Sequence, residues 1–167
     1  IDGVVKSAAI GGGHTLLLLE DGSVYGCGSN VAGQIGLGAE IAEINTPTLL
    51  AIDAVEKISS GLNFSLIKAA DGLYIMGSNE FGNLCIDSGG QNIMTPTLID
   101  DVAVSIVASF EAIKSSSFIS FLDGSVGACG ANSAGQLGDG TNEDRIRTVI
   151  DPLPDSSPVR KLGVGPS

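Results

Sequence analysis

Residues 19–38 read LEDGSVYGCGSNVAGQIGLG and contain six glycines. Glycine adopts left-handed backbone conformations without steric cost, so it serves both where backbone amides cradle a phosphate and where a chain turns tightly. The stretch therefore indicates either a nucleotide-binding loop or a series of turns, and the rest of the sequence decides between them.

The same pattern returns twice along the chain. Residues 70–87 read ADGLYIMGSNEFGNLCID, and residues 122–140 read LDGSVGACGANSAGQLGDG. Each copy has an Asp-Gly pair, a short apolar run, a Gly-x-Asn triplet and then Gly-Gln or Gly-Asn. Self-similarity at a fixed period is the sequence signature of repeat architectures, so these glycines belong to a repeat rather than to a single site.

Blocks outside the glycine-rich stretch recur in the same order. VVKSAAIGGGHTLLLL at residues 4–19 matches VEKISSGLNFSLIK at 55–68, and VRKLGVGPS at the end of the chain opens in the same way. The sequence therefore predicts one partial domain over 1–167, with repeats at 4–54, 55–102 and 103–158 and the start of a fourth at 159–167.

The residue pattern of each repeat predicts several short β-strands. An apolar run ends in Asp-Gly, a hairpin signal, and a second strand follows it. Further strands are predicted to start at the apolar pairs that begin with Ile35, Leu84 and Leu137, and after the Thr-Pro pair. Leu16–Leu19 is apolar without alternation, as in a strand buried on both faces. Sheets stacked about an axis bury strands in this way, so the sequence predicts an all-β fold of about three four-stranded antiparallel β-propeller blades.

The positions shared by the copies are predicted to have structural roles, as turns and anchors of each blade. They are His14, Asp21, Gly22, Gly28, Asn30, Gly33 and Gln34 in the first copy, Asp71, Gly72, Gly77, Asn79 and Gly82 in the second, and Asp123, Gly124, Gly130, Asn132, Gly135 and Gln136 in the third. Because Cys85 replaces Gly36 in the second copy, Gly36 is predicted to be the most dispensable shared position.

GGGHTLLLLEDGSVYGCGSNVAGQIGLG and DGSVGACGANSAGQLGDGTNEDR resemble the regulator of chromosome condensation repeat, whose pattern runs Gly-x-x-His-Ser-Leu-Ala-Leu, Asp-Gly, Val-Tyr, Trp-Gly-x-Asn, Gly-Gln-Leu-Gly. Seven such repeats usually close a seven-bladed propeller, so the resemblance implies that this chain is part of a longer one. The family's Trp is Cys27, Met76 and Cys129 here, and its His survives only as His14. The resemblance implies that this His binds backbone groups inside its own blade.

No residue pattern indicates a catalytic, cofactor or metal site. GCGSNVAG at residues 26–33 misplaces the third glycine of G-x-G-x-x-G, and neither Gly-Lys-Ser/Thr nor a helix follows it. DGTNEDR at 139–145 lacks the Gly and Glu of a calcium loop. His14 has no Ser or Asp partners in a catalytic pattern. We expect no enzymatic residues, no cofactor and no metal.

The net charge of −11 argues against nucleic-acid binding and against docking on anionic membranes, and it suits a basic protein surface. The alternative is that the charge only keeps an apolar, glycine-rich chain soluble. The three cysteines show no CxxC spacing. A reducing compartment is expected, with the cytoplasm favoured, and Cys27 and Cys129 are expected to be buried, inert thiols.

The resemblance implies two functions. One is a non-enzymatic platform for protein–protein interaction inside a larger regulatory protein. The other is guanine-nucleotide exchange on a small GTPase, which displaces nucleotide without bond chemistry. The chromosome-bound exchange factor of this family inserts a β-wedge into one blade. The spacing of 50 and 52 residues between Asp-Gly pairs leaves no room for it in these repeats, so a wedge would have to lie in other blades of the longer chain. The platform is therefore the preferred prediction.

Overall fold

The computed structural model describes residues 1–99 and 107–151, and these residues form twelve β-strands. Blade 1 contains β1 (Val5–Ile10), β2 (His14–Leu19), β3 (Val24–Ser29) and β4 (Glu43–Leu49). Blade 2 contains β5 (Val55–Ser60), β6 (Phe64–Ala69), β7 (Leu73–Gly77) and β8 (Ile93–Leu98). Blade 3 contains β9 (Val107–Ile113), β10 (Ser116–Phe121), β11 (Val126–Gly130) and β12 (Arg145–Asp151). The predicted start of a fourth repeat at 159–167 lies outside the described residues.

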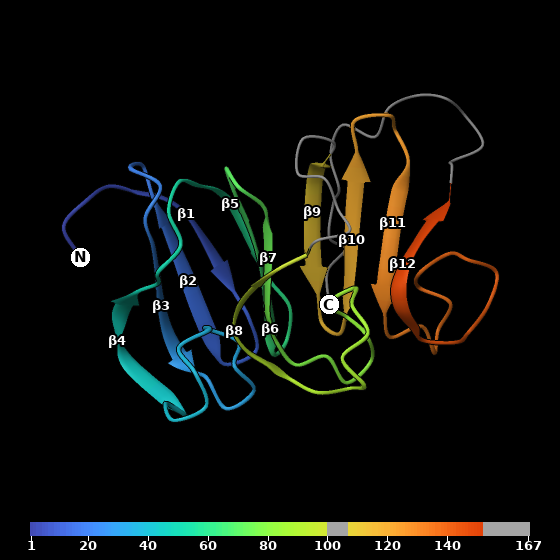
Figure 1. The fold of residues 1–167 in the computed structure, drawn as a ribbon, viewed down its shortest axis with the longest axis horizontal. Coiled ribbons are helices and arrows are strands. Elements are labelled where there is room, and N and C mark those ends of the chain that lie inside the picture. The colour runs from blue at the N-terminus through green and yellow to red at the C-terminus, as the bar shows by residue number, and fades with distance from the viewer. Residues whose placement is uncertain (100–106, 152–167) are drawn as a thin grey trace.

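Each blade is one antiparallel sheet whose strands pair in chain order. Figure 1 shows the three sheets side by side, in the order of the sequence. The prediction of all-β, four-stranded propeller blades is confirmed for the described residues. None of these residues forms a helix long and apolar enough to cross a membrane.

The first and third Asp-Gly pairs form tight hairpins, whereas the second hairpin differs. Gly22 and Gly124 have left-handed φ angles of 84° and 88°. Asp21 and Asp123 each accept hydrogen bonds from the serine two residues later, as in an Asx turn. In blade 2 only residues 70–72 separate the strands, so Gly72 needs no left-handed backbone there.

The glycine-rich loop after the second hairpin strand is anchored by one asparagine in each blade. Asn30, Asn79 and Asn132 are all buried, and the side-chain oxygen of each accepts a hydrogen bond from the backbone amide five residues later. Their amide groups donate across the loop, for example from Asn30 to the carbonyls of Gly38 and Ile41. These loops are turns, so the predicted strand starts within them are wrong.

The hydrophobic core lies between the blades. Leu16, Leu18, Val24 and Ile35 of blade 1 pack against Ile58, Ile67 and Met76 of blade 2. Phe64, Leu66, Leu73 and Ile75 of blade 2 pack against Val107, Phe110 and Ile119 of blade 3. Neighbouring residues of β6 therefore enter different cores, which explains an apolar strand without alternation. Fully burying one such side chain stabilises the fold by about 1.5–3 kcal/mol.

Candidate interaction surfaces

One hydrogen bond recurs at both contacts between blades. The hydroxyl of Ser65 donates to the carbonyl of Gln34 at 2.8 Å, and Ser117 donates to the carbonyl of Asn83 at 2.5 Å. The two serines occupy the same position of β6 and β10, and the two carbonyls belong to the same loop position one blade earlier. The predicted repeat position Gln34 and its counterpart Asn83 thus join neighbouring blades through their backbone carbonyls.

His14 is also part of the first contact between blades. His14 is 2 % exposed, and its Nε2 lies 2.9 Å from the Ser65 hydroxyl oxygen. Because that hydroxyl hydrogen is directed to Gln34, Nε2 carries the proton and donates, and Nδ1 is a buried acceptor without a partner. Burial lowers the pKa of His14 to about 4. The bond to a side chain of the next blade corrects the expectation of backbone groups within its own blade.

Phe64 and Ser116 begin the second strand of their blades, as His14 does. His14 pairs with Gly28, Phe64 with Gly77 and Ser116 with Gly130. A Cβ at each of these glycines would collide with the carbonyl of the residue preceding its partner, and all three have φ above 100°. Close approach of two backbones therefore accounts for this glycine in every copy.

The cysteine prediction is wrong for Cys129, which forms a disulfide with Cys85 across the contact between blades 2 and 3. Cys27 is a free, half-buried thiol. This disulfide was not predictable from the repeats, because Cys85 and Cys129 occupy different positions of successive copies. Because two of the three cysteines form a disulfide, the cysteines no longer support the expectation of a reducing compartment.

Gly36, predicted to be the most dispensable shared position, is constrained in the structure, although Cys85 replaces it in the second copy. It has a φ of 80°, and a Cβ there would lie 2.7 Å from the Sδ of Met76 in the next blade. Cys85 adopts the same left-handed region, with a φ of 60°, and is bonded to Cys129, which occupies the place of Met76. The second copy thus replaces a close contact between blades with a covalent one.

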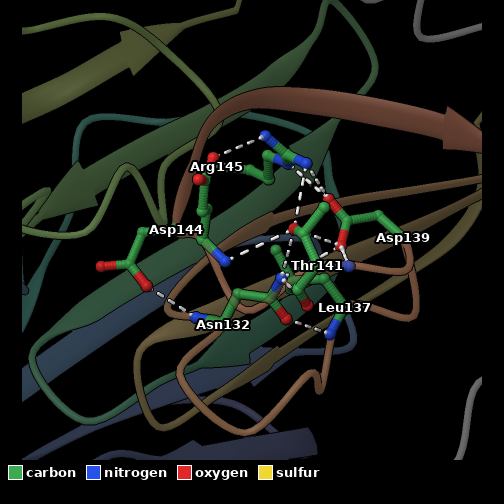
Figure 2. A network of polar contacts seen from close by, with 7 residues as sticks. Asn132, Leu137, Asp139, Thr141, Asp144 and Arg145 are labelled. Carbon is green, nitrogen blue, oxygen red and sulfur yellow. Dashed lines mark hydrogen bonds and ion pairs between the residues drawn. The ribbon is translucent and has the colours of Figure 1, made fainter.

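In the acidic loop of blade 3, residues 139–145, the Arg145 guanidinium pairs with the Asp139 carboxylate (Figure 2). The Asp139 carboxylate accepts hydrogen bonds from the hydroxyl and amide of Thr141 and from the side chains of Asn132 and Arg145. The Thr141 hydroxyl is the main cause of a pKa lowered to about 2 for Asp139. The Asp144 carboxylate accepts a hydrogen bond from the backbone N–H of Asn132. The oxygen atoms that resembled a calcium loop are thus engaged by protein donors.

Exposed carboxylates lie at both ends of the sheets. The long loops gather at the lower end in Figure 1. The exposed acids of these loops are Glu40, Glu80, Asp87, Glu143 and Asp144, and Glu43 is exposed beside them at the start of β4. Glu20, Asp21, Asp53, Asp71 and Asp123 are exposed in the turns and connections at the opposite end. Among the described residues, no group of three or more His, Cys, Asp or Glu is arranged to hold a metal.

Comparisons with known proteins agree with this architecture. Residues 5–34 and 21–67 match models of the Regulator of chromosome condensation (RCC1) repeat. Protein RCC2 of Homo sapiens is 39% identical over 93 residues, which are 54% of this chain and 18% of RCC2. The secretion-regulating guanine nucleotide exchange factor of Bos taurus is 30% identical over 109 residues, which are 64% of this chain and 24% of that protein.

Among solved structures, Prp20p of Saccharomyces cerevisiae superimposes with a TM-score of 0.75 and 24% identity, over 87% of this chain and 38% of Prp20p. The chain thus spans only about a fifth to two fifths of these relatives. The matched repeats, the three sheets of one topology and the likeness to Prp20p show that this chain carries RCC1-type repeats that fold as blades of a β-propeller.

Proposed function

We propose that this chain is a non-enzymatic platform for protein–protein interaction within a larger regulatory protein. The proposal rests on the observation that the recurring polar residues form hydrogen bonds within the fold. Asn30, Asn79 and Asn132 close loops, and Gln34 and Asn83 join blades. What remains for a partner is the acidic surface at the two ends of the sheets. Loops on a rigid scaffold are where binding usually resides.

The charge of these ends favours a basic surface on the partner. Exposed carboxylates steer an oppositely charged protein and select against acidic ones. Such binding weakens as salt screens the charges. A partner that binds the long-loop end should bind E40Q/E43Q more weakly, whereas E20Q/D53N, which removes two exposed carboxylates at the opposite end, is the matched control.

Guanine-nucleotide exchange on a small GTPase is the second candidate. The relative from Bos taurus is named as an exchange factor, and the Prp20p structure is described together with binding to Gsp1p and histones. These names belong to proteins several times longer than the matched segment. They support a regulatory protein of this class and leave exchange as a separate question.

Nucleotide release distinguishes the two candidates. Small GTPases loaded with a fluorescent guanine nucleotide are mixed with the intact protein, and the loss of fluorescence is followed with time. The platform predicts that release stays at the intrinsic rate even where pull-down against nucleotide-free GTPases detects a complex. Accelerated release by the intact protein would overturn the proposal and favour exchange.

A further inference from the structure

A recess opens at the long-loop end of the contact between blades 2 and 3. Its volume is about 80 Å³, which is too small for a whole organic ligand and suits a single side chain. It lies at this end because β6 begins at Phe64 beside Gly77, where β7 ends. All four strands of both blades are among the described residues. The residues that line the recess include Asn63, Ser78, Glu80, Phe81, Asn83 and Lys114.

A shorter side chain leaves two polar groups in this recess without a partner. In blades 1 and 3 the side-chain oxygens of Gln34 and Gln136 accept hydrogen bonds from the backbone N–H two residues earlier, at 2.9 and 3.0 Å. Asn83 holds this position in blade 2, is one methylene shorter, and donates instead to the Ser78 carbonyl at 2.5 Å. Among the described residues, no group donates to the Asn83 oxygen and none accepts from the Phe81 N–H. Asn83 is 2 % exposed, and a buried polar group without a partner costs free energy until a ligand supplies one.

These features occur in one blade and are not part of the repeat. Phe81 stands where blades 1 and 3 have Ala32 and Ala134, and Glu80 stands beside it where the other copies are uncharged. Leu62, at the edge of the recess, is 49 % exposed although backbone hydrogen bonds join its turn to both neighbouring blades. A residue that every blade needs recurs in every copy, so a set of substitutions confined to blade 2 indicates a binding site.

The chemistry of the recess fits a guanidinium group, which donates hydrogen bonds and accepts none. The Asn83 oxygen, the Ser78 hydroxyl and the Glu80 carboxylate are acceptors for it. The Phe81 ring offers a face for stacking, and Leu62 offers apolar surface for the aliphatic part of the side chain. We propose that this recess binds an arginine side chain of a protein partner. The inference rests on the proposed platform function and names the chemistry by which the long-loop end recognises a basic partner.

The surrounding charges favour a cation over an anion. Glu80 and Lys114 both line the recess, so their charges largely offset each other there. The other exposed acids of the long loops, such as Glu40, Asp87 and Glu143, add a negative potential around it. The opposite occupant is a carboxylate held by Lys114, and the experiment below distinguishes the two.

NMR titration with small probes tests the site directly. N-acetyl-arginine methylamide is added to the ¹⁵N-labelled chain, and the amide signals of Phe81 and Asn83 should shift and saturate. The signals of Ala32 and Gln34, at the same places of blade 1, should stay still because Gln34 satisfies its own loop. The matching lysine derivative controls for charge and salt, and it should bind more weakly because an ammonium group does not stack or donate as a planar fork. Sodium acetate is the anionic probe.

Variants identify the groups that bind the probe. N83Q restores the residue of blades 1 and 3, so it should engage the Phe81 N–H, fill the recess and abolish arginine binding without lowering the unfolding midpoint. E80Q and F81A should each weaken binding by about two- to fivefold. K114A removes the opposing charge and should strengthen binding. E40Q is the matched control for E80Q, since it removes an exposed carboxylate of the same end outside the recess.

The outcomes that overturn the inference are distinct from those that overturn the platform. An arginine derivative that moves neither the Phe81 nor the Asn83 signal, or that binds N83Q as well as the wild type, would overturn it. Shifts with acetate that disappear in K114A would overturn it as well, because they would assign the recess to a carboxylate. Accelerated nucleotide release would overturn the platform whether or not arginine binds here. A recess that binds no arginine would leave the acidic ends as the surface for a partner.

Discussion

Replacing His14 with phenylalanine should remove a specific part of the acid sensitivity of this fold. His14 is buried with an unpartnered Nδ1, and its pKa is lowered to about 4 from a usual 6.5. Phe64 occupies the same place in blade 2, so the fold already accepts a phenylalanine ring at this position. H14F is therefore a variant that removes the titration with little change of shape.

The direction of the change in stability follows from which state of the chain, folded or unfolded, binds the proton on His14 more readily. The unfolded chain protonates His14 as pH falls below about 6.5, whereas the folded chain resists protonation until about pH 4. The unfolded state then binds more protons, so the free energy of unfolding decreases as pH falls through this window. The shift corresponds to about 3 kcal/mol over the whole window, of which about 2 kcal/mol is lost between about pH 7 and pH 4.5.

The assay is urea unfolding of wild type and H14F at these two pH values. Asp21, Asp123 and Asp139 have lowered pKa values, so they also destabilise the fold in acid, but they do so equally in both proteins. The expected result is that wild type loses about 2 kcal/mol more than H14F on acidification. Identical losses in the two proteins would refute the reasoning, because they would mean that His14 titrates alike when folded and unfolded.

Two further predictions concern the contacts within and between blades. Reducing the Cys85–Cys129 disulfide, whose cysteines are 44 residues apart in sequence, should lower the free energy of unfolding by up to about 4 kcal/mol in the chain-entropy model. Urea unfolding with and without reductant measures this loss. An unchanged unfolding midpoint would contradict the prediction. G28A should cost more than G38A, since both glycines are left-handed but only the Cβ at position 28 meets backbone. The left-handed conformation alone costs about 1–2 kcal/mol, so thermal denaturation should show both losses and a clear excess for G28A; equal losses would argue against close packing of the backbones.

The repeats made the blades predictable from the sequence, because each copy carries its own turn signals. Asp-Gly pairs and Gly-x-Asn triplets are local features, and they correctly indicate hairpins and anchored loops. What joins one blade to the next was not predictable in this way. Ser65 and Gln34 lie 31 residues apart, and no local pattern links them.

The disulfide shows the same limit. Comparing equivalent positions of the copies places Cys85 with Gly36 and Cys129 with Cys27, which hides their contact. Contacts between blades pair different positions of successive copies, so they become visible only once the sheets are placed side by side. The pairing of Asp139 with Arg145 was also not predicted. It forms because the loop between them turns back and brings residue 145 next to residue 139.

The central claim is that successive copies are equivalent blades joined by one repeated contact. The most direct test is the double variant G36C/M76C, which places cysteines at the positions of Cys85 and Cys129, whose Cα atoms are 5.4 Å apart. After air oxidation and denaturation without reductant, thiol labelling should modify only Cys27, as in the wild type. Labelling of the two introduced thiols as well, at the level seen in a G38C/M76C control, would contradict the claim that blades 1 and 2 meet as blades 2 and 3 do.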